Sequence, residues 1–198
     1  MEFQEVVRRR RMIREYADAP VDQTIIDRAL ANAVRAPSAG FSQGWAFLLL
    51  DSPEDVGRFW EVSTPPNAEV ASWLAGARRA PVIIVPMSCK RVYLERYAEP
   101  DKGWTDLDES HWPVPYWDID TGMAALIMLQ TIVDEGLGGL FIGISPEEMA
   151  PFRAAFDVPD DYTPIGAVSV GHRAPDRRSP SLKRGRRPVS EVVHRGHW

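Results

Sequence analysis

Hydrophobic residues recur along this chain with periods that distinguish helices from strands. Helical spacing predicts helices over 2–11, 21–35, 54–62, 69–78, 90–98 and 146–156, with Asp22 as the N-cap of the second. Continuous apolar or β-branched runs predict strands over 45–50, 81–86 and 165–171, and 136–144 leads into a further strand. Strands separated by helices indicate a mixed α/β sandwich.

Two segments depart from ordinary amphipathic patterning. A helix that starts at Asp118 or Asp120, capped by these carboxylates, and ends near Glu135 has almost no polar face, which predicts burial all round and a central position shared with a second subunit. The segment 99–117 has no clean period, and long irregular segments are often functional lids. Its aromatic residues either stack on a substrate or pack in the core or interface: Trp104, Trp112, Tyr116 and Trp117.

Composition narrows the class of protein. The chain has 198 residues, 44% of them hydrophobic, and a net charge of -5, which predicts a single globular domain over 1–198 with no nucleic-acid partner. Cys89 is the only cysteine, and the N-terminus lacks an apolar signal region. The longest apolar run, 123–129, is too short to span a membrane. We therefore expect a cytoplasmic protein without a membrane partner.

Arginine is concentrated in two places in this acidic chain. Arg8–Arg11 and Arg14 put five guanidinium groups within seven residues, and Arg184–Arg187 holds a second cluster in which three of four residues are arginine. Guanidinium groups keep their charge and bind phosphate through paired donors, so a shared phosphate ligand would explain both clusters. The competing interpretations are a solvated basic helix end for the first cluster and a flexible basic tail for the second.

Four segments, in order, resemble the motifs of the nitroreductase family. They are Arg10–Tyr16, Ala36–Trp45, the glycines of Gly136–Gly143, and Arg184–Pro188. The resemblance covers nearly the whole chain. It implies an α+β fold, a three-layer sandwich with a central mixed β-sheet, and a domain-swapped homodimer with FMN at the subunit interface. The extension 188–198 fits this scheme either as an edge strand over 189–193 or as an arm that reaches a partner.

The resemblance also implies which residues form the site. Those at cofactor-binding positions of the family are Arg10, Arg11, Met12, Arg14, Pro37, Ser38, Ala39, Gln43, Phe141, Ile142, Gly143, Arg184 and Arg186. The Gly143 N–H would lie near flavin N5, and glycine permits that close approach. Those expected to contact the substrate are Phe41, Trp112 and Tyr116.

The implied activity is transfer of electrons from NAD(P)H through FMN to an electron-poor organic acceptor, with no catalytic side chain. Met12 and Phe41 replace a serine and an asparagine of the family motifs. These changes motivate an alternative, a flavin-binding protein without reductase turnover.

The sequence Gly40–Gly44 matches the Gly-x-Ser-x-Gly motif of serine hydrolases. That motif needs a strand before the serine and a helix after it, whereas here a helix precedes and a strand follows. His194 and His197 have no third ligand nearby, so no metal is expected.

Overall fold

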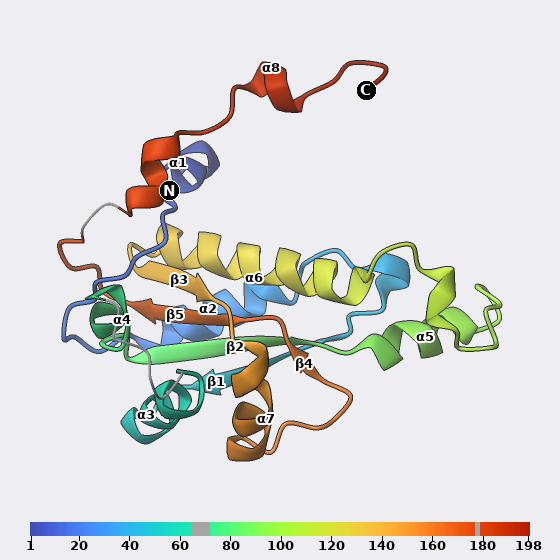
Figure 1. The fold of residues 1–198 in the computed structure, drawn as a ribbon, viewed down its shortest axis with the longest axis horizontal. Coiled ribbons are helices and arrows are strands. Elements are labelled where there is room, and N and C mark those ends of the chain that lie inside the picture. The colour runs from blue at the N-terminus through green and yellow to red at the C-terminus, as the bar shows by residue number, and fades with distance from the viewer. Residues whose placement is uncertain (65–71, 177–178) are drawn as a thin grey trace.

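The computed structural model describes residues 1–64, 72–176 and 179–198 (Figure 1). Its helices are α1 (Phe3–Arg9), α2 (Gln23–Ala33), α3 (Pro53–Val62), α4 (Ser72–Ala77), α5 (Lys90–Ala98), α6 (Tyr116–Asp134), α7 (Pro146–Ala155) and α8 (Val189–Val192). Its strands are β1 (Trp45–Leu50), β2 (Val82–Ser88), β3 (Gly138–Ile142), β4 (Thr163–Pro164) and β5 (Ala167–Gly171). Three short 3₁₀ turns are η1 (Ala39–Phe41), η2 (Glu109–His111) and η3 (Pro180–Arg184).

The strands form one sheet in the order β1-β2-β5-β3, with β4 paired to β2. Every pair of these strands is antiparallel. The one parallel pairing in the described residues is an isolated bridge between Met12 and Gly139. The expectation of a mixed sheet was therefore wrong for the strands themselves, because the parallel neighbour of β3 is only a short stretch of extended chain.

The sheet separates two hydrophobic cores because successive side chains on a strand point to opposite faces. On β2, Ile84 belongs to the core shared with α2 and α6, whereas Ile83 and Val85 belong to the core shared with α3 and α7. All of β2 is buried, as expected for a central strand covered on both faces. Figure 1 shows the same three layers. The expected three-layer α+β sandwich is confirmed.

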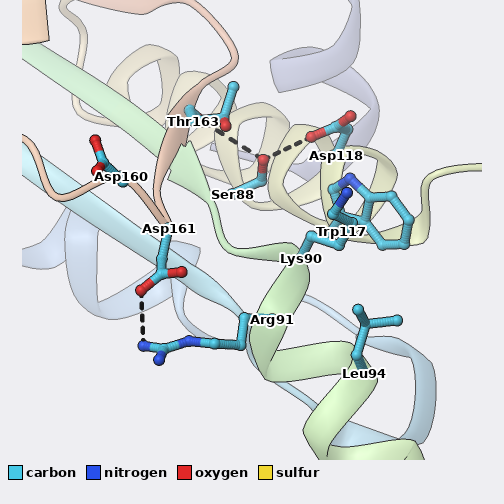
Figure 2. Close-up of a pocket in the computed structure, with 9 residues that line it drawn as sticks. All are labelled: Ser88, Lys90, Arg91, Leu94, Trp117, Asp118, Asp160, Asp161 and Thr163. Atoms are coloured by element: carbon cyan, nitrogen blue, oxygen red, sulfur yellow. Dashed lines mark hydrogen bonds and ion pairs between the residues drawn. The ribbon is translucent and has the colours of Figure 1, made fainter. Parts of the chain in front are cut away.

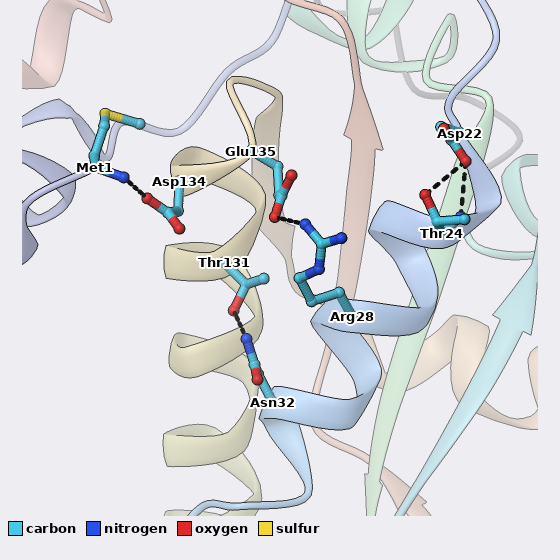
Figure 3. Close-up of polar contacts among 8 residues, drawn as sticks. All are labelled: Met1, Asp22, Thr24, Arg28, Asn32, Thr131, Asp134 and Glu135. Atoms are coloured by element: carbon cyan, nitrogen blue, oxygen red, sulfur yellow. Dashed lines mark hydrogen bonds and ion pairs between the residues drawn. The ribbon is translucent and has the colours of Figure 1, made fainter.

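The helices α2 and α6 pack side by side over one face of the sheet (Figure 3). The Asp22 side chain accepts a hydrogen bond from the Thr24 N–H at 2.9 Å, so the predicted N-cap of α2 is confirmed. Asn32 donates to the Thr131 hydroxyl at 3.1 Å between the two helices. An ion pair between Arg28 and Glu135 joins α2 to the end of α6.

The long apolar helix α6 begins earlier than its sequence pattern indicated. It starts at Tyr116 with Pro115 in the capping position, so the prediction that Asp118 or Asp120 caps it was wrong. Both carboxylates lie inside the helix and bond to other elements instead. Neither α6 nor any other helix in the described ranges has the length and hydropathy needed to cross a membrane.

Of two further predicted elements, the first differs from the structure and the second is observed. The segment 189–193 contains the short helix α8, not an edge strand, and it makes no sheet pairing among the described residues. Its residues are exposed, and the chain there runs away from the sheet (Figure 1). The predicted helix over 69–78 is observed as α4; residues 69–71 lie outside the described ranges.

Candidate functional site

The segment after α1 carries the first arginine cluster onto the edge of the sheet beside β3. The Ile13 N–H donates to the Gly139 carbonyl at 3.0 Å. Farther along, the buried Tyr16 hydroxyl donates to the Ser169 carbonyl at 3.1 Å. These contacts hold the backbone of 10–16 in one place, so the arginines project from an anchored segment.

A cleft of about 720 Å³ opens beside this segment. Its walls come from three stretches, 10–14, 173–176 and 179–186. The Arg14 N–H donates to Asp176 Oδ2 at 3.0 Å and joins the first two walls. Two arginine clusters that are far apart in the sequence therefore meet at one cleft, lined by Arg10, Arg11, Arg14 and Arg186. Arg184 is exposed in η3 and does not line the cleft.

The cleft is positively charged and poor in acidic partners. Within the described residues, no ion pair involves its arginines, which are Arg10, Arg11, Arg14, Arg173 and Arg186. Burial, together with repulsion from Arg11 and Arg9, lowers the pKa of Arg173. A dianionic group in the cleft would relieve this repulsion and accept hydrogen bonds from several guanidinium groups. The donor set therefore fits a phosphate.

Arg173 is a lining residue that the sequence motifs do not single out. It comes two positions after β5, and its Nε donates to the Leu137 carbonyl at 2.9 Å. Its side chain lies against Gly138, where an added Cβ would come within 2.9 Å of Arg173 Cγ. A lone arginine directly after a strand gives little signal in a sequence, because its partners depend on which strand lies beside it.

Met12 lines the cleft, but its sulfur faces the sheet. The Phe141 N–H donates to Met12 Sδ at 3.4 Å, and the Met12 side chain packs against both hydrophobic cores. Met12 therefore satisfies a strand amide and offers the cleft no hydroxyl. The methionine that replaces the serine of the family motif therefore has a packing role, which the motif alone did not show.

The end of β3 lies outside the cleft lining. Phe141 and Ile142 are half-buried, and Gly143 is exposed just beyond the strand. The Phe141 ring covers Gly166, where an added Cβ would lie 2.5 Å from Phe141 Cζ. A Cβ added at Gly143 would meet no atom within 4 Å. Packing within one chain therefore gives no reason for a glycine at 143.

The predicted loop residues lie on another part of the molecule, around η1. Pro37 and Gln43 are exposed, Ser38 and Ala39 are half-buried, and Phe41 keeps 75% of its surface exposed. The Gln43 N–H donates to Ser38 Oγ at 3.0 Å, which closes the turn. None of these residues lines the arginine cleft.

Within one chain, the loop around η1 and the arginine cleft lie near opposite ends of α6. Ala39 is bonded to Asp120 near the start of α6, whereas the N-terminus of the chain is bonded to Asp134 at its end (Figure 3). These two positions are separated by about 21 Å at 1.5 Å per helical residue. Gly139, which anchors the arginine segment, follows shortly after that same end. The structure thus joins the two arginine clusters but does not bring the loop to them.

The segment 99–117 folds into an aromatic cluster centred on Trp112. Five aromatic rings have centroids 4.4–6.1 Å from that of Trp112, those of Tyr93, Tyr97, Trp104, Tyr116 and Trp117. The Trp112 indole N–H is buried and has no hydrogen-bond partner in the described part of the chain. Tyr116 is 36% exposed. Within one chain Trp112 therefore packs against other aromatic residues, and Tyr116 presents part of its ring to solvent.

A smaller hollow of about 370 Å³ lies between the start of α5 and the start of α6 (Figure 2). Ser88 Oγ donates to Asp118 Oδ1 at 2.6 Å, and Arg91 pairs with Asp161 at 2.8 Å. These groups are satisfied by one another, and among the described residues expected to contact cofactor or substrate, Trp117 alone lines the hollow. Across the described ranges, no group of three or more His, Cys, Asp or Glu side chains is arranged to hold a metal ion.

Comparison with known proteins gives a consistent result. The sequence model of the Nitroreductase family matches residues 7–172. A relative from Methanothermobacter thermautotrophicus, provisionally named an NADH dehydrogenase/NAD(P)H nitroreductase, is 26% identical over 177 residues, which are 88% of this chain and 78% of the relative. A nitroreductase family crystal structure from Clostridium difficile has 21% identity, a TM-score of 0.74 and full coverage of both chains. A structure from Exiguobacterium sibiricum, solved in complex with FMN, has 20% identity, a TM-score of 0.74 and coverage of 98% and 97%.

Proposed function

This chain belongs to the nitroreductase family, and from that premise we propose that it binds FMN and passes electrons from NAD(P)H to an electron-poor organic acceptor. The acceptor class comprises nitroaromatics, quinones and enones. The observation that carries the proposal is the meeting of two remote arginine clusters at one cleft. Relatives with NAD(P)H nitroreductase names and a structural neighbour that contains FMN support it.

The cleft would hold the FMN phosphate. Arg10 and Arg14 come from one wall of the cleft and Arg186 from another, so their guanidinium groups can surround a phosphate from two sides. Arg11 and Arg173 add charge to the same cleft, and Arg184 would reach it only by a change of side-chain conformation or from a partner. Bound FMN supplies the redox chemistry, and these residues supply affinity and orientation.

A homodimer is part of the proposal. The flavin-binding loop 37–43 and the arginine cleft lie near opposite ends of α6, so a second copy would be needed to place both against one flavin. Ile119 and Leu126 leave 42% and 45% of their surface exposed on α6, where a partner would cover them. The exposed apolar side chains of the segment 188–198 would cross to the partner in a domain-swapped arrangement.

The flavin ring would then lie between the loop of one protomer and the end of β3 of the other. Phe141, Ile142 and Gly143 would border it from one side, with the exposed Gly143 leaving room for close approach. Pro37, Ser38, Ala39 and Gln43 would border it from the other.

The acceptor would bind above the flavin against aromatic side chains. Phe41 is 75% exposed and Tyr116 is 36% exposed, so both can contact a planar acceptor. Trp112 would contribute as the wall behind Tyr116, since the two ring centroids are 5.7 Å apart. A cytoplasmic setting, where nicotinamide coenzymes are present and thiols stay reduced, suits the single buried Cys89.

The purified full-length protein tests this function directly. We expect it to be yellow or to take up added FMN, to bleach anaerobically with NADH or NADPH, and to regain colour when a quinone or nitroaromatic compound is added. Bound flavin that neither coenzyme reduces would favour the alternative, a flavin-binding protein without turnover. Colourless protein that takes up no FMN would contradict both.

A further inference from the structure

The loop that follows α2 has a strained backbone. Phe41 and Gln43 have φ angles of 56° and 54°, in the left-handed region that favours glycine, and Gly40 between α2 and Phe41 has a φ of 60°. A non-glycine residue is uncommon in this region and persists there only where the surrounding structure fixes it. Specific contacts must therefore hold the loop in this conformation.

One buried carboxylate oxygen supplies the main contact. Asp120 Oδ2 accepts the Ala39 N–H at 2.8 Å and the Tyr93 hydroxyl at 2.8 Å. Asp120 is 2% exposed and Tyr93 is fully buried, so water does not compete for these bonds. Burial and the hydrogen bond to Asp120 raise the pKa of Tyr93, which keeps the phenol a donor at all ordinary pH values.

The helix α5 forms the floor beneath the loop. A Cβ added at Gly44 would lie 2.5 Å from the Tyr93 ring, and one added at Gly40 would lie 2.6 Å from the Tyr97 ring. Arg96 Nε donates to the Gly40 carbonyl at 3.0 Å. The loop therefore rests on two tyrosine rings one helical turn apart, but only Tyr93 is hydrogen-bonded to Asp120.

We propose that Asp120 and Tyr93 are positioning residues for the cofactor, because their shared hydrogen bonds fix the loop that faces the flavin. The proposal rests on the FMN-binding function above. The two side chains would not contact the flavin or the acceptor themselves; they would act through the Ala39 backbone and so through the neighbouring Ser38 and Gln43. Breaking the bonds would let the loop leave its strained conformation and alter the environment of the flavin ring.

The test compares two tyrosines on one helix. Tyr93→Phe removes the hydroxyl that bonds to Asp120 and keeps the ring, while Tyr97→Phe removes a hydroxyl from the neighbouring ring under the same loop, with no hydrogen bond recorded for it in the described residues. Each full-length variant is reconstituted with FMN, and FMN affinity, the visible circular dichroism of bound flavin and the melting temperature are measured. We expect Tyr93→Phe to bind FMN about tenfold more weakly and to change the dichroism, and Tyr97→Phe to stay within about twofold of the unmodified protein.

A second pair of variants tests whether the negative charge of Asp120 is needed in addition to its oxygen acceptor. Asp120→Asn keeps an oxygen acceptor but removes the charge, and Asp118→Asn makes the same change at the neighbouring carboxylate, which bonds to Ser88 instead (Figure 2). We expect weaker FMN binding and altered dichroism for Asp120→Asn only.

The outcomes separate the two proposals. Folded Tyr93→Phe and Asp120→Asn proteins with unaltered FMN affinity and dichroism would overturn the positioning role, even if their melting temperatures fell. If Asp120→Asn fails to fold, Tyr93→Phe decides the question because it removes a single hydroxyl. An unmodified protein that takes up no FMN would instead refute the proposed function, and the positioning role with it.

Discussion

At the scale of single residues, arginine carries the candidate site because its charge is permanent and its donors are planar. The cleft brings together arginines from two distant parts of the chain, and burial, together with repulsion from Arg11 and Arg9, lowers the pKa of Arg173. Met12 shows the opposite case. Its sequence position matches a cofactor contact, yet its sulfur accepts the Phe141 N–H. The same motif thus contains arginines that line the cleft and a methionine that lines it while its sulfur accepts a hydrogen bond from the sheet.

Removing the arginines should weaken cofactor binding. Arg10→Ala and Arg186→Ala should each cost about 1.5–3 kcal/mol in FMN binding, roughly 10- to 100-fold, because each removes hydrogen bonds to a charged phosphate. Fluorescence titration would measure this. Riboflavin, which has no phosphate, should bind all variants alike, and Arg35→Ala, at an exposed position after α2, should bind FMN normally. Equal losses for FMN and riboflavin would contradict the phosphate role.

Tyr16 gives a pH-dependent prediction. Burial raises the pKa of its phenol above the ordinary value of about 10, so the folded state keeps the proton that the unfolded chain loses. Its contribution to stability is complete below pH 10 and falls above it by about 1.4 kcal/mol per pH unit. Tyr16→Phe should be less stable by about 1–2 kcal/mol at pH 9, and this gap should shrink by about 1.4 kcal/mol at pH 11. Urea unfolding at both pH values checks it; a constant gap would be inconsistent with a buried neutral phenol.

At the scale of elements, apolar periodicity located the helices because burying a helix face leaves a 3.6-residue pattern that needs no knowledge of the partner. The strand β2 was located as a continuous apolar run. Both faces of this strand are buried because a hydrophobic core lies on each side of the sheet. The start of α6 was misplaced because Asp118 and Asp120 look like capping residues. Their actual partners, Ser88 and Ala39, belong to other elements and are chosen by tertiary packing.

The exposed face of α6 predicts an interface. Leu126→Glu should weaken the dimer by about 100-fold or more, because burying an unpaired carboxylate costs at least about 3 kcal/mol. Gly57→Glu places the same charge on the exposed side of α3, where an added Cβ meets nothing, and should leave the dimer intact. Sedimentation velocity over a concentration series measures both. Equal behaviour of the two variants would rule out α6 as the interface.

At the scale of the whole molecule, the arrangement within one chain leaves the candidate site divided. The arginine cleft and the loop 37–43 are anchored near opposite ends of α6. The C-terminal segment leaves the body of the protein and carries exposed apolar side chains, including Val189 at 73% and Trp198 at 98% exposure (Figure 1). Both features fit a protein that completes its site by pairing with a second copy.

Deleting Pro188–Trp198 should weaken the dimer without unfolding the protein, because in one chain this segment is exposed throughout. Deleting only Gly196–Trp198 provides the control and should have a smaller effect. Analytical ultracentrifugation measures the assembly, and far-UV circular dichroism confirms the fold. A dimer of undiminished affinity after the longer deletion would exclude a crossover by this segment.

The sequence alone determined the order and type of most elements and the phosphate-suited chemistry of the arginines, because periodicity and side-chain charge are local properties. The meeting of Arg10 and Arg186, the addition of Arg173, and the bonds of Asp120 to Ala39 and Tyr93 were decided by the tertiary structure. Such contacts join residues far apart in the chain, and their geometry depends on how the sheet brings distant segments together.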